Sequence, residues 1–175
     1  MLDLLDPDAL GEPGTMIFQV DERIAPDDDP DRNLTNLRDH LSALALEWLL
    51  PMPVTDDDPD AAASAYGNAL PDSIDLVHLG LGPDGHTASL VPGDAVLEVS
   101  DRPVALTAGE YQGRRRMTLT YVALNAAGRI LFLVTGEDKR EALAKLRAGD
   151  DSIPAGRLEP QAGLIIADAA AVGDA

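Results

Sequence analysis

The residues with the clearest chemical potential lie in the stretch GLGPDGHTAS, residues 80–89, directly after an apolar segment. Asp84 and His86 place a carboxylate and an imidazole two residues apart, and Gly82 and Gly85 allow the backbone to approach a ligand closely. Imidazole is the side chain whose ordinary pKa lies nearest to neutral pH, so a histidine here can take a proton from water. By itself the pattern also fits a glycine turn whose carboxylate caps the next helix.

A second charged group follows the apolar run at residues 15–20. Asp21, Glu22 and Arg23 come directly after it, and Asn33 lies ten residues beyond Arg23. Three charges after a strand are typical of a solvated loop. If the strand before them is a neighbour of the strand before residue 80, both charged groups open at the same edge of the sheet, where ligands bind in α/β proteins.

Basic residues that lie near predicted turns form a third group. Arg116 closes a run of three arginines, Lys139 opens a helix after a glycine turn, and Arg157 follows Pro-Ala-Gly. Arginine offers a two-pronged donor and lysine a point charge to phosphate oxygens. Solvation at the surface is the alternative for each of them alone. We expect His78 in the core and His40 on a polar helix face, neither with a catalytic role.

The elements that must position these groups alternate between strands and helices. Strands are predicted at residues 15–20, 75–82, 103–107, 117–120, 130–134 and 164–167. Helices are predicted at residues 34–48, 61–70 and 138–146, with a surface loop at 51–59. Several strands are apolar on both faces, as in parallel sheets covered by helices. The sequence predicts a doubly wound, Rossmann-like α/β fold with a mostly parallel sheet, in a single domain over residues 1–175.

Composition excludes several classes of protein. The chain has 175 residues, of which 31 are acidic and 13 basic, and its formal net charge of -18 opposes binding to nucleic acid and to anionic membrane surfaces. The absence of cysteine excludes disulfides, thiolate catalysis and sulfur-ligated metals. No apolar run is long enough to cross a bilayer, and the first residues lack a basic signal-peptide start. We expect an acidic, cytoplasmic protein, a monomer or homodimer without a metal site.

Taken together, these segments resemble the 6-phosphogluconolactonase family, part of a wider group that includes glucosamine-6-phosphate deaminases. The matching segments run in order through residues 20–26, 30–33, 61–70, 75–93, 116–120, 123–127, 131–140 and 154–157. The stretch GPDGHTASLVPG, residues 82–93, is specific to this group.

The resemblance implies hydrolysis of 6-phospho-D-glucono-1,5-lactone to 6-phospho-D-gluconate, in the oxidative pentose phosphate pathway, without metal or organic cofactor. It implies that His86 activates the attacking water and that Asp84 and Asp21 order the site. By the same resemblance the substrate-binding residues are Arg23, Asn33, Gly82, Gly85, Arg116, Lys139 and Arg157. A strained ester needs only modest acceleration, which one general base and a held phosphate can supply.

Two positions favour a lactonase over a deaminase-like isomerase, the runner-up function. Deaminases resemble this chain at Asp21, Asp84 and His86, but they carry a glutamate five residues after the histidine, where this sequence has Val91. They also usually place a tyrosine where Arg23 stands.

The chain departs from the family pattern near its start. Family members carry a Ser-Gly-Gly-Ser-Thr-Pro-like phosphate loop ahead of the first strand seen here, and nothing in residues 1–14 matches it. Residues 2–10 resemble the tail of the helix that follows that loop, so we expect an N-terminally shortened chain. Two alternatives follow: an inactive sugar-phosphate-binding module, which a partner chain could complete, or an α/β domain with an unrelated anion site. Arg32 and Gly156 also stand where the family commonly has serine.

Overall fold

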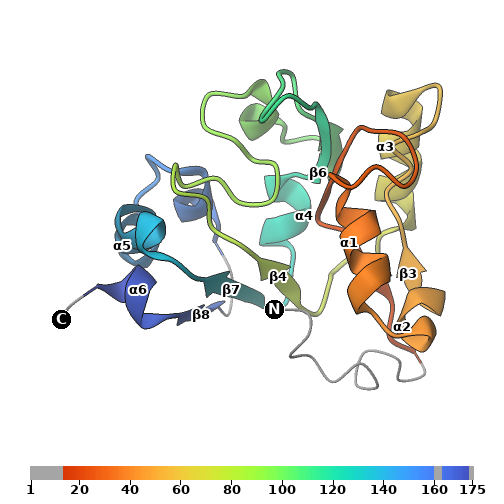
Figure 1. Ribbon diagram of the computed structural model, residues 1–175. Coiled ribbons are helices and arrows are strands. Elements are labelled where there is room, and N and C mark those ends of the chain that lie inside the picture. The colour runs from red at the N-terminus through yellow and green to blue at the C-terminus, as the bar shows by residue number, and fades with distance from the viewer. Residues whose placement is uncertain (1–13, 160–162, 174–175) are drawn as a thin grey trace.

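The computed structural model describes residues 14–159 and 163–173, and within these residues three small sheets form the framework (Figure 1). Two sheets are parallel, one of two strands and one in the order β4-β7-β8; their strands are β1 (Ile17–Phe18), β3 (Leu49–Leu50), β4 (Val77–Leu79), β7 (Ile130–Val134) and β8 (Gly163–Ala167). The third sheet is antiparallel in the order β2-β6-β5, with strands β2 (Asp21–Arg23), β5 (Val104–Leu106) and β6 (Arg116–Leu119).

Helices lie between the strands and on both sides of the molecule. The α-helices are α1 (Asn33–His40), α2 (Ala43–Glu47), α3 (Pro59–Ala69), α4 (Tyr121–Asn125), α5 (Arg140–Ala148) and α6 (Ala169–Val172). Short 3-10 turns are η3 (Ala95–Glu98), η4 (Glu137–Lys139) and η5 (Pro154–Arg157). Figure 1 shows α5 and α6 beside β7 and β8, and α1, α2 and α3 at the other side near β3. This α/β arrangement, with parallel strands flanked by helices, confirms the predicted fold class.

Side-chain alternation divides the β4-β7-β8 sheet into a buried and an open face. Val77 and Leu79 of β4 and Phe132 of β7 point into the main core, because successive side chains of a strand point to opposite faces. On the opposite face, His78 is exposed and Leu164 of β8 is 59% exposed. The prediction that His78 belongs to the core was therefore wrong: an apolar strand sequence does not tell which of its two faces is covered.

The region after β1 differs from the expected strand and charged loop. Instead of one strand over residues 15–20, β1 covers two residues, and Asp21–Arg23 form a strand of their own. In β2, Glu22 is paired in register with Met117 of β6, and its side chain is completely buried. The alternative of a solvated loop does not hold, because this carboxylate has hydrogen-bond donors inside the protein.

The helix predicted over residues 34–48 is divided in two. The backbone N–H of Leu41 makes the last hydrogen bond of α1, to Leu37, and Ser42 begins α2 by accepting a hydrogen bond from the N–H of Ala45 at 3.1 Å. A serine in this position is a good N-cap, which the continuous apolar spacing concealed. The predicted helix tail at residues 2–10 lies outside the described residues. In the ranges that the structure covers, no helix is long and apolar enough to cross a membrane.

Candidate active site

Glu22 fixes the start of α1 against β2. Its carboxylate accepts hydrogen bonds from the backbone N–H groups of Asn33 and Leu34, each at 2.8 Å. These two groups belong to the first turn of the helix, which has no internal acceptor for them. Arg32, the residue before α1, makes no side-chain cap, so the buried glutamate of a neighbouring strand takes that role. The effect is to hold Asn33 beside β2.

Asp21 and Arg23 lie on the face of β2 opposite the buried glutamate, and Asn33 joins them. The Asn33 amide donates to the Asp21 carboxylate at 3.1 Å, and its oxygen accepts from Arg23 Nη1 at 2.7 Å. Ser89 Oγ donates to the other Asp21 oxygen at 2.6 Å, and Arg116 Nη1 lies 3.8 Å from the same oxygen. The structure thus brings together Asp21, Arg23, Asn33 and Arg116, four of the residues that the resemblance assigned to the site, and it adds Ser89.

This cluster has an unusual electrostatic environment. Burial raises the pKa of Asp21, although the hydrogen bond from Ser89 and the charges of Arg116 and Arg23 oppose the shift. Burial also lowers the pKa of Arg116, and the nearby charge of Arg23 adds to that effect. Arg116 Nε is buried and has no hydrogen-bond partner within the described residues. A buried N–H without a protein partner can be satisfied by an oxygen of an anionic ligand.

Asp84 and His86 form the second half of the site, in the loop after β4. Asp84 Oδ1 lies 2.6 Å from His86 Nδ1 and accepts the backbone N–H of the same histidine at 3.1 Å. Burial alone would raise the pKa of Asp84, but these hydrogen bonds and the imidazole hold it below its usual value. An ionised carboxylate can only accept, so Nδ1 carries the proton. Nε2 is then the nitrogen whose lone pair can take a proton from water.

Two glycines make this loop possible. A Cβ on Gly82 would overlap the imidazole of His86, and one on Gly85 would overlap the side chain of Ile153. Gly85 also has a φ of +83°, in the region that favours glycine. Gly82 and Gly85 therefore act here through close packing and backbone conformation.

Tyr111 is a site residue that the sequence did not indicate. Its hydroxyl lies 3.4 Å from both Asp84 Oδ2 and His86 Nδ1, and its ring meets the imidazole edge-on with centroids 5.0 Å apart. The guanidinium of Arg116 lies 5.2 Å from the centre of the same ring. Tyr111 thus joins the two halves of the site. An aromatic residue near a Gln-Gly turn was the only local signal of this role.

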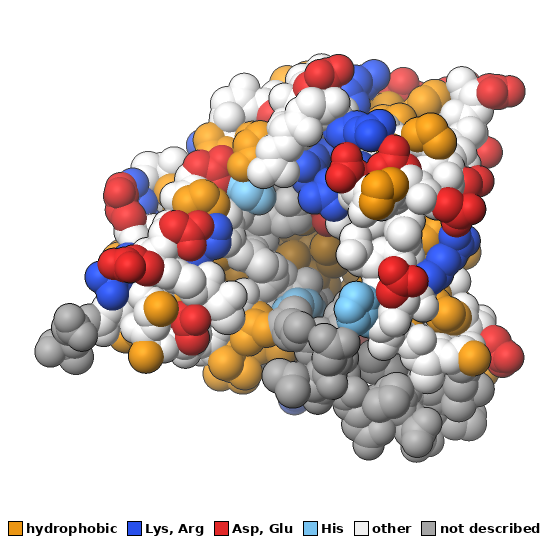
Figure 2. Space-filling view, viewed as in Figure 1, with side chains coloured by type: hydrophobic (Ala, Val, Ile, Leu, Met, Phe, Trp, Pro, Cys, Tyr) orange, Lys and Arg blue, Asp and Glu red, His pale blue; other side chains and the backbone are white. Residues whose placement is uncertain are grey.

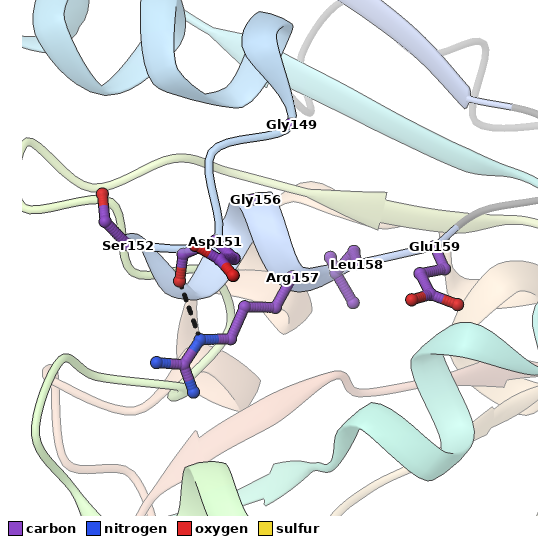
Figure 3. Close-up of a pocket in the computed structure, with 7 residues that line it drawn as sticks. All are labelled: Gly149, Asp151, Ser152, Gly156, Arg157, Leu158 and Glu159. Carbon is purple, nitrogen blue, oxygen red and sulfur yellow. Dashed lines mark hydrogen bonds between the residues drawn. The ribbon is translucent and has the colours of Figure 1, made fainter.

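Within the part of the chain that the structure describes, Lys139 and Arg157 contact none of the site residues above and pair with other groups instead. Lys139 pairs with Asp138 at 2.7 Å. Arg157 Nε donates to the backbone oxygen of Asp151 at 2.9 Å, and its Nη1 lies 3.6 Å from Glu98. Figure 3 shows Arg157 turned toward Asp151 among the residues that line a pocket. The volume of this pocket is about 680 Å³. Their part in substrate binding stays a prediction.

One face of the molecule is hollowed. Figure 2 shows Lys and Arg side chains gathered along one rim of a hollow on the viewed face. Across residues 14–159 and 163–173, no group of three or more His, Asp or Glu side chains is placed to hold a metal ion. In this arrangement the oriented imidazole can take a proton from water. The two neighbouring arginines can hold an anionic substrate beside it.

Comparison with known proteins identifies the family of this chain. Residues 5–167 match the model of the family described as glucosamine-6-phosphate isomerases/6-phosphogluconolactonase. A 6-phosphogluconolactonase from Nostoc is 36% identical over 173 residues, covering 89% of this chain and 71% of the relative. One from Mycobacterium tuberculosis is 36% identical over 159 residues, covering 79% and 64%.

Solved structures agree with the sequence relatives. The crystal structure of a 6-phosphogluconolactonase from Thermotoga maritima is 27% identical with a TM-score of 0.76, over 87% of this chain and 72% of that one. A monomeric glucosamine-6-phosphate deaminase shares the fold at 20% identity, with a TM-score of 0.73 over 89% of this chain and 73% of that one. The chain belongs to the glucosamine-6-phosphate isomerase/6-phosphogluconolactonase family.

Proposed function

We propose that this chain hydrolyses 6-phospho-D-glucono-1,5-lactone to 6-phospho-D-gluconate, with His86 as the general base. The observation that carries the proposal is the 2.6 Å contact between His86 Nδ1 and the Asp84 carboxylate, which leaves Nε2 as the base. The curated relatives named above are 6-phosphogluconolactonases, and they support this substrate and reaction. The reaction is the hydrolysis of a cyclic ester in the oxidative pentose phosphate pathway.

In the proposed reaction, a water oxygen attacks the lactone carbonyl carbon while Nε2 of His86 takes one of the water protons. The imidazolium that forms is stabilised by the Asp84 carboxylate at Nδ1. The tetrahedral intermediate then collapses, the bond between the carbonyl carbon and the ring oxygen breaks, and the proton passes to that ring oxygen. No oxidant, reductant or cofactor enters the balance.

The cations of the site would hold the substrate by its phosphate and neighbouring oxygens. Arg116 offers a buried Nε without a partner within the described residues, and Arg23 lies close enough to perturb it. Lys139 and Arg157 would complete the set on the substrate's arrival. When the phosphate is held, the lactone carbonyl stays in place beside the attacking water. This positioning supplies a large part of the needed acceleration.

Two features of the chain support the lactonase over the deaminase reaction. Val91 stands five residues after His86, where a ring-opening relay would need a carboxylate. Arg23 stands in the place of a tyrosine and is fixed by Asn33 at 2.7 Å. The cytoplasmic location, the single-domain organisation and the monomer or homodimer state stay predictions.

The test is the replacement His86→Ala, assayed by the acid released from the lactone above the spontaneous rate. Loss of a general base lowers turnover by about 10²–10⁴-fold. His78→Ala is the matched control, because His78 is an exposed histidine of β4 outside the site, and it should keep the wild-type rate. An unchanged rate in the folded His86→Ala protein would remove the general-base assignment.

A further inference from the structure

A hairpin between β5 and β6 carries its tip to the Asp84–His86 loop. Tyr111 and Arg114 face each other across the tip: the N–H of Tyr111 donates to the Arg114 oxygen at 3.0 Å, and the N–H of Arg114 donates back at 3.4 Å. Gln112 and Gly113 form the two-residue connection, with φ values of +55° and +77°. Positive φ at both positions is the requirement of a type I′ turn, which matches the twist of a hairpin.

Arginine side chains fasten this tip from two sides. Arg116 Nη2 donates to the backbone oxygen of Tyr111 at 3.3 Å and to Gln112 Oε1 at 3.2 Å. On the other side, Arg114 Nη2 lies 2.9 Å from Asp29 Oδ2, in the loop before α1. The tip is therefore held both to Arg116 of the site and to the loop before α1. This anchorage is needed because a glutamine in the left-handed region is disfavoured by itself.

The held tip places the Tyr111 ring against one side of the imidazole. The ring planes of Tyr111 and His86 make an angle of 62° at a centroid distance of 5.0 Å. The ring contacts the imidazole directly, and the phenol oxygen at its end lies 3.4 Å from Nδ1, which shows that the ring lies on the Nδ1 side of the imidazole. The Asp84 side chain is 36% exposed and that of His86 20%. Water can compete for a hydrogen bond at such a depth, and an aromatic cover reduces that competition.

We propose that Tyr111 is a positioning residue for the hydrolysis: its ring keeps water away from the Nδ1–Asp84 hydrogen bond and so holds His86 with Nε2 as the base. The inference rests on the proposed function. The ring carries the role because the hydroxyl contacts, at 3.4 Å, are at the long limit for hydrogen bonds. Burial and the nearby Asp84 charge raise the pKa of Tyr111, so the phenol stays neutral beside the carboxylate.

The kinetic test compares Tyr111→Ala with Tyr111→Phe. Loss of one orienting contact should lower kcat of Tyr111→Ala about tenfold, with KM within about twofold of wild type. Tyr111→Phe keeps the ring and should retain at least about half of the wild-type kcat. Glu110→Ala, at an exposed position of the same hairpin, is the control and should leave both constants unchanged. Arg114→Ala keeps the Tyr111 side chain but releases the tip from Asp29, so the ring should lose its fixed position and kcat should fall.

A second measurement uses the free protein and needs no substrate. Proton NMR of histidine labelled with nitrogen-15 reports how fast the His86 Nδ1 proton exchanges with water. We expect slow exchange in wild type and Tyr111→Phe, and exchange at least about tenfold faster in Tyr111→Ala. Thermal unfolding of each variant verifies that the fold is kept.

The outcomes separate this inference from the proposed function. A wild-type protein that does not open the lactone would end the proposed function, and the exchange of the Nδ1 proton would still judge the role of Tyr111. Equal exchange in all three proteins would overturn the inference. So would a Tyr111→Phe variant as slow as Tyr111→Ala, or an effect confined to KM.

Discussion

Glu22→Gln should destabilise the protein strongly although the change replaces one oxygen by an NH₂ group of nearly equal size. Glu22 Oε1 accepts the N–H groups of Arg23 and Asn33, each at 2.8 Å. Oε2 accepts the N–H of Leu34 at 2.8 Å and Gln19 Nε2 at 3.0 Å. Whichever way the glutamine amide is turned, its NH₂ group faces two donors that lose their acceptor.

The expected magnitude follows from that count. Each buried donor left without an acceptor costs about 1–3 kcal/mol, so two of them lower the free energy of unfolding by roughly 2–6 kcal/mol. For a protein of this length, about 2–4 °C of melting temperature corresponds to 1 kcal/mol, so the decrease in Tm is roughly 5–20 °C. Asn33 is held by the same carboxylate, so lactone hydrolysis should fall as well.

Thermal and urea unfolding at pH 7 would measure this change. Asp27→Asn is the matched control, because it also removes one carboxylate charge from the Arg32 network. The Asp27 side chain is 69% exposed and lies 2.6 Å from Arg32 Nη1, so its loss should cost less than about 1 kcal/mol. If Glu22→Gln costs no more than Asp27→Asn, the capping role assigned to Glu22 is wrong.

Two other changes test the loop geometry and the acid stability. Gly82→Ala should lower kcat at least about tenfold by displacing the His86 imidazole, whereas Gly80→Ala, where a Cβ has open space, should stay within about twofold in the same lactone assay. Burial alone would raise the pKa of Asp94, but hydrogen bonds from three backbone N–H groups hold it below its usual value. The stability that Asp94 contributes is therefore present above its unfolded pKa of about 3.9 and is lost as the pH falls through the lower folded pKa. In urea unfolding, the difference in the free energy of unfolding between wild type and Asp94→Asn should shrink toward pH 3. A free-energy difference that grows in acid would contradict this reasoning.

Local pattern was enough for several elements. The apolar run at residues 130–134 forms β7 over the predicted residues, since a short, densely apolar stretch has few other ways to be buried. The helix predicted over residues 61–70 is α3, whose start two residues earlier comes from the Asp58 cap and a proline in the first turn. The Asp84–His86 pair was also visible, because two residues in one turn meet without help from the rest of the chain.

Contacts between distant segments were decided only by the tertiary structure. Ser89 reaches Asp21 across 68 positions, Tyr111 reaches His86 across 25, and Glu22 caps a helix that begins eleven residues later. The chain by itself predicted the fold class and the proximity of Asp84 and His86, since these depend on local spacing and residue type, and its motifs carried the resemblance to the family. Whether a charged side chain is solvated or buried depends on the donors that other segments bring to it. Periodicity along one segment contains no information about those donors, and so Glu22 and Tyr111 emerged only from the packed structure.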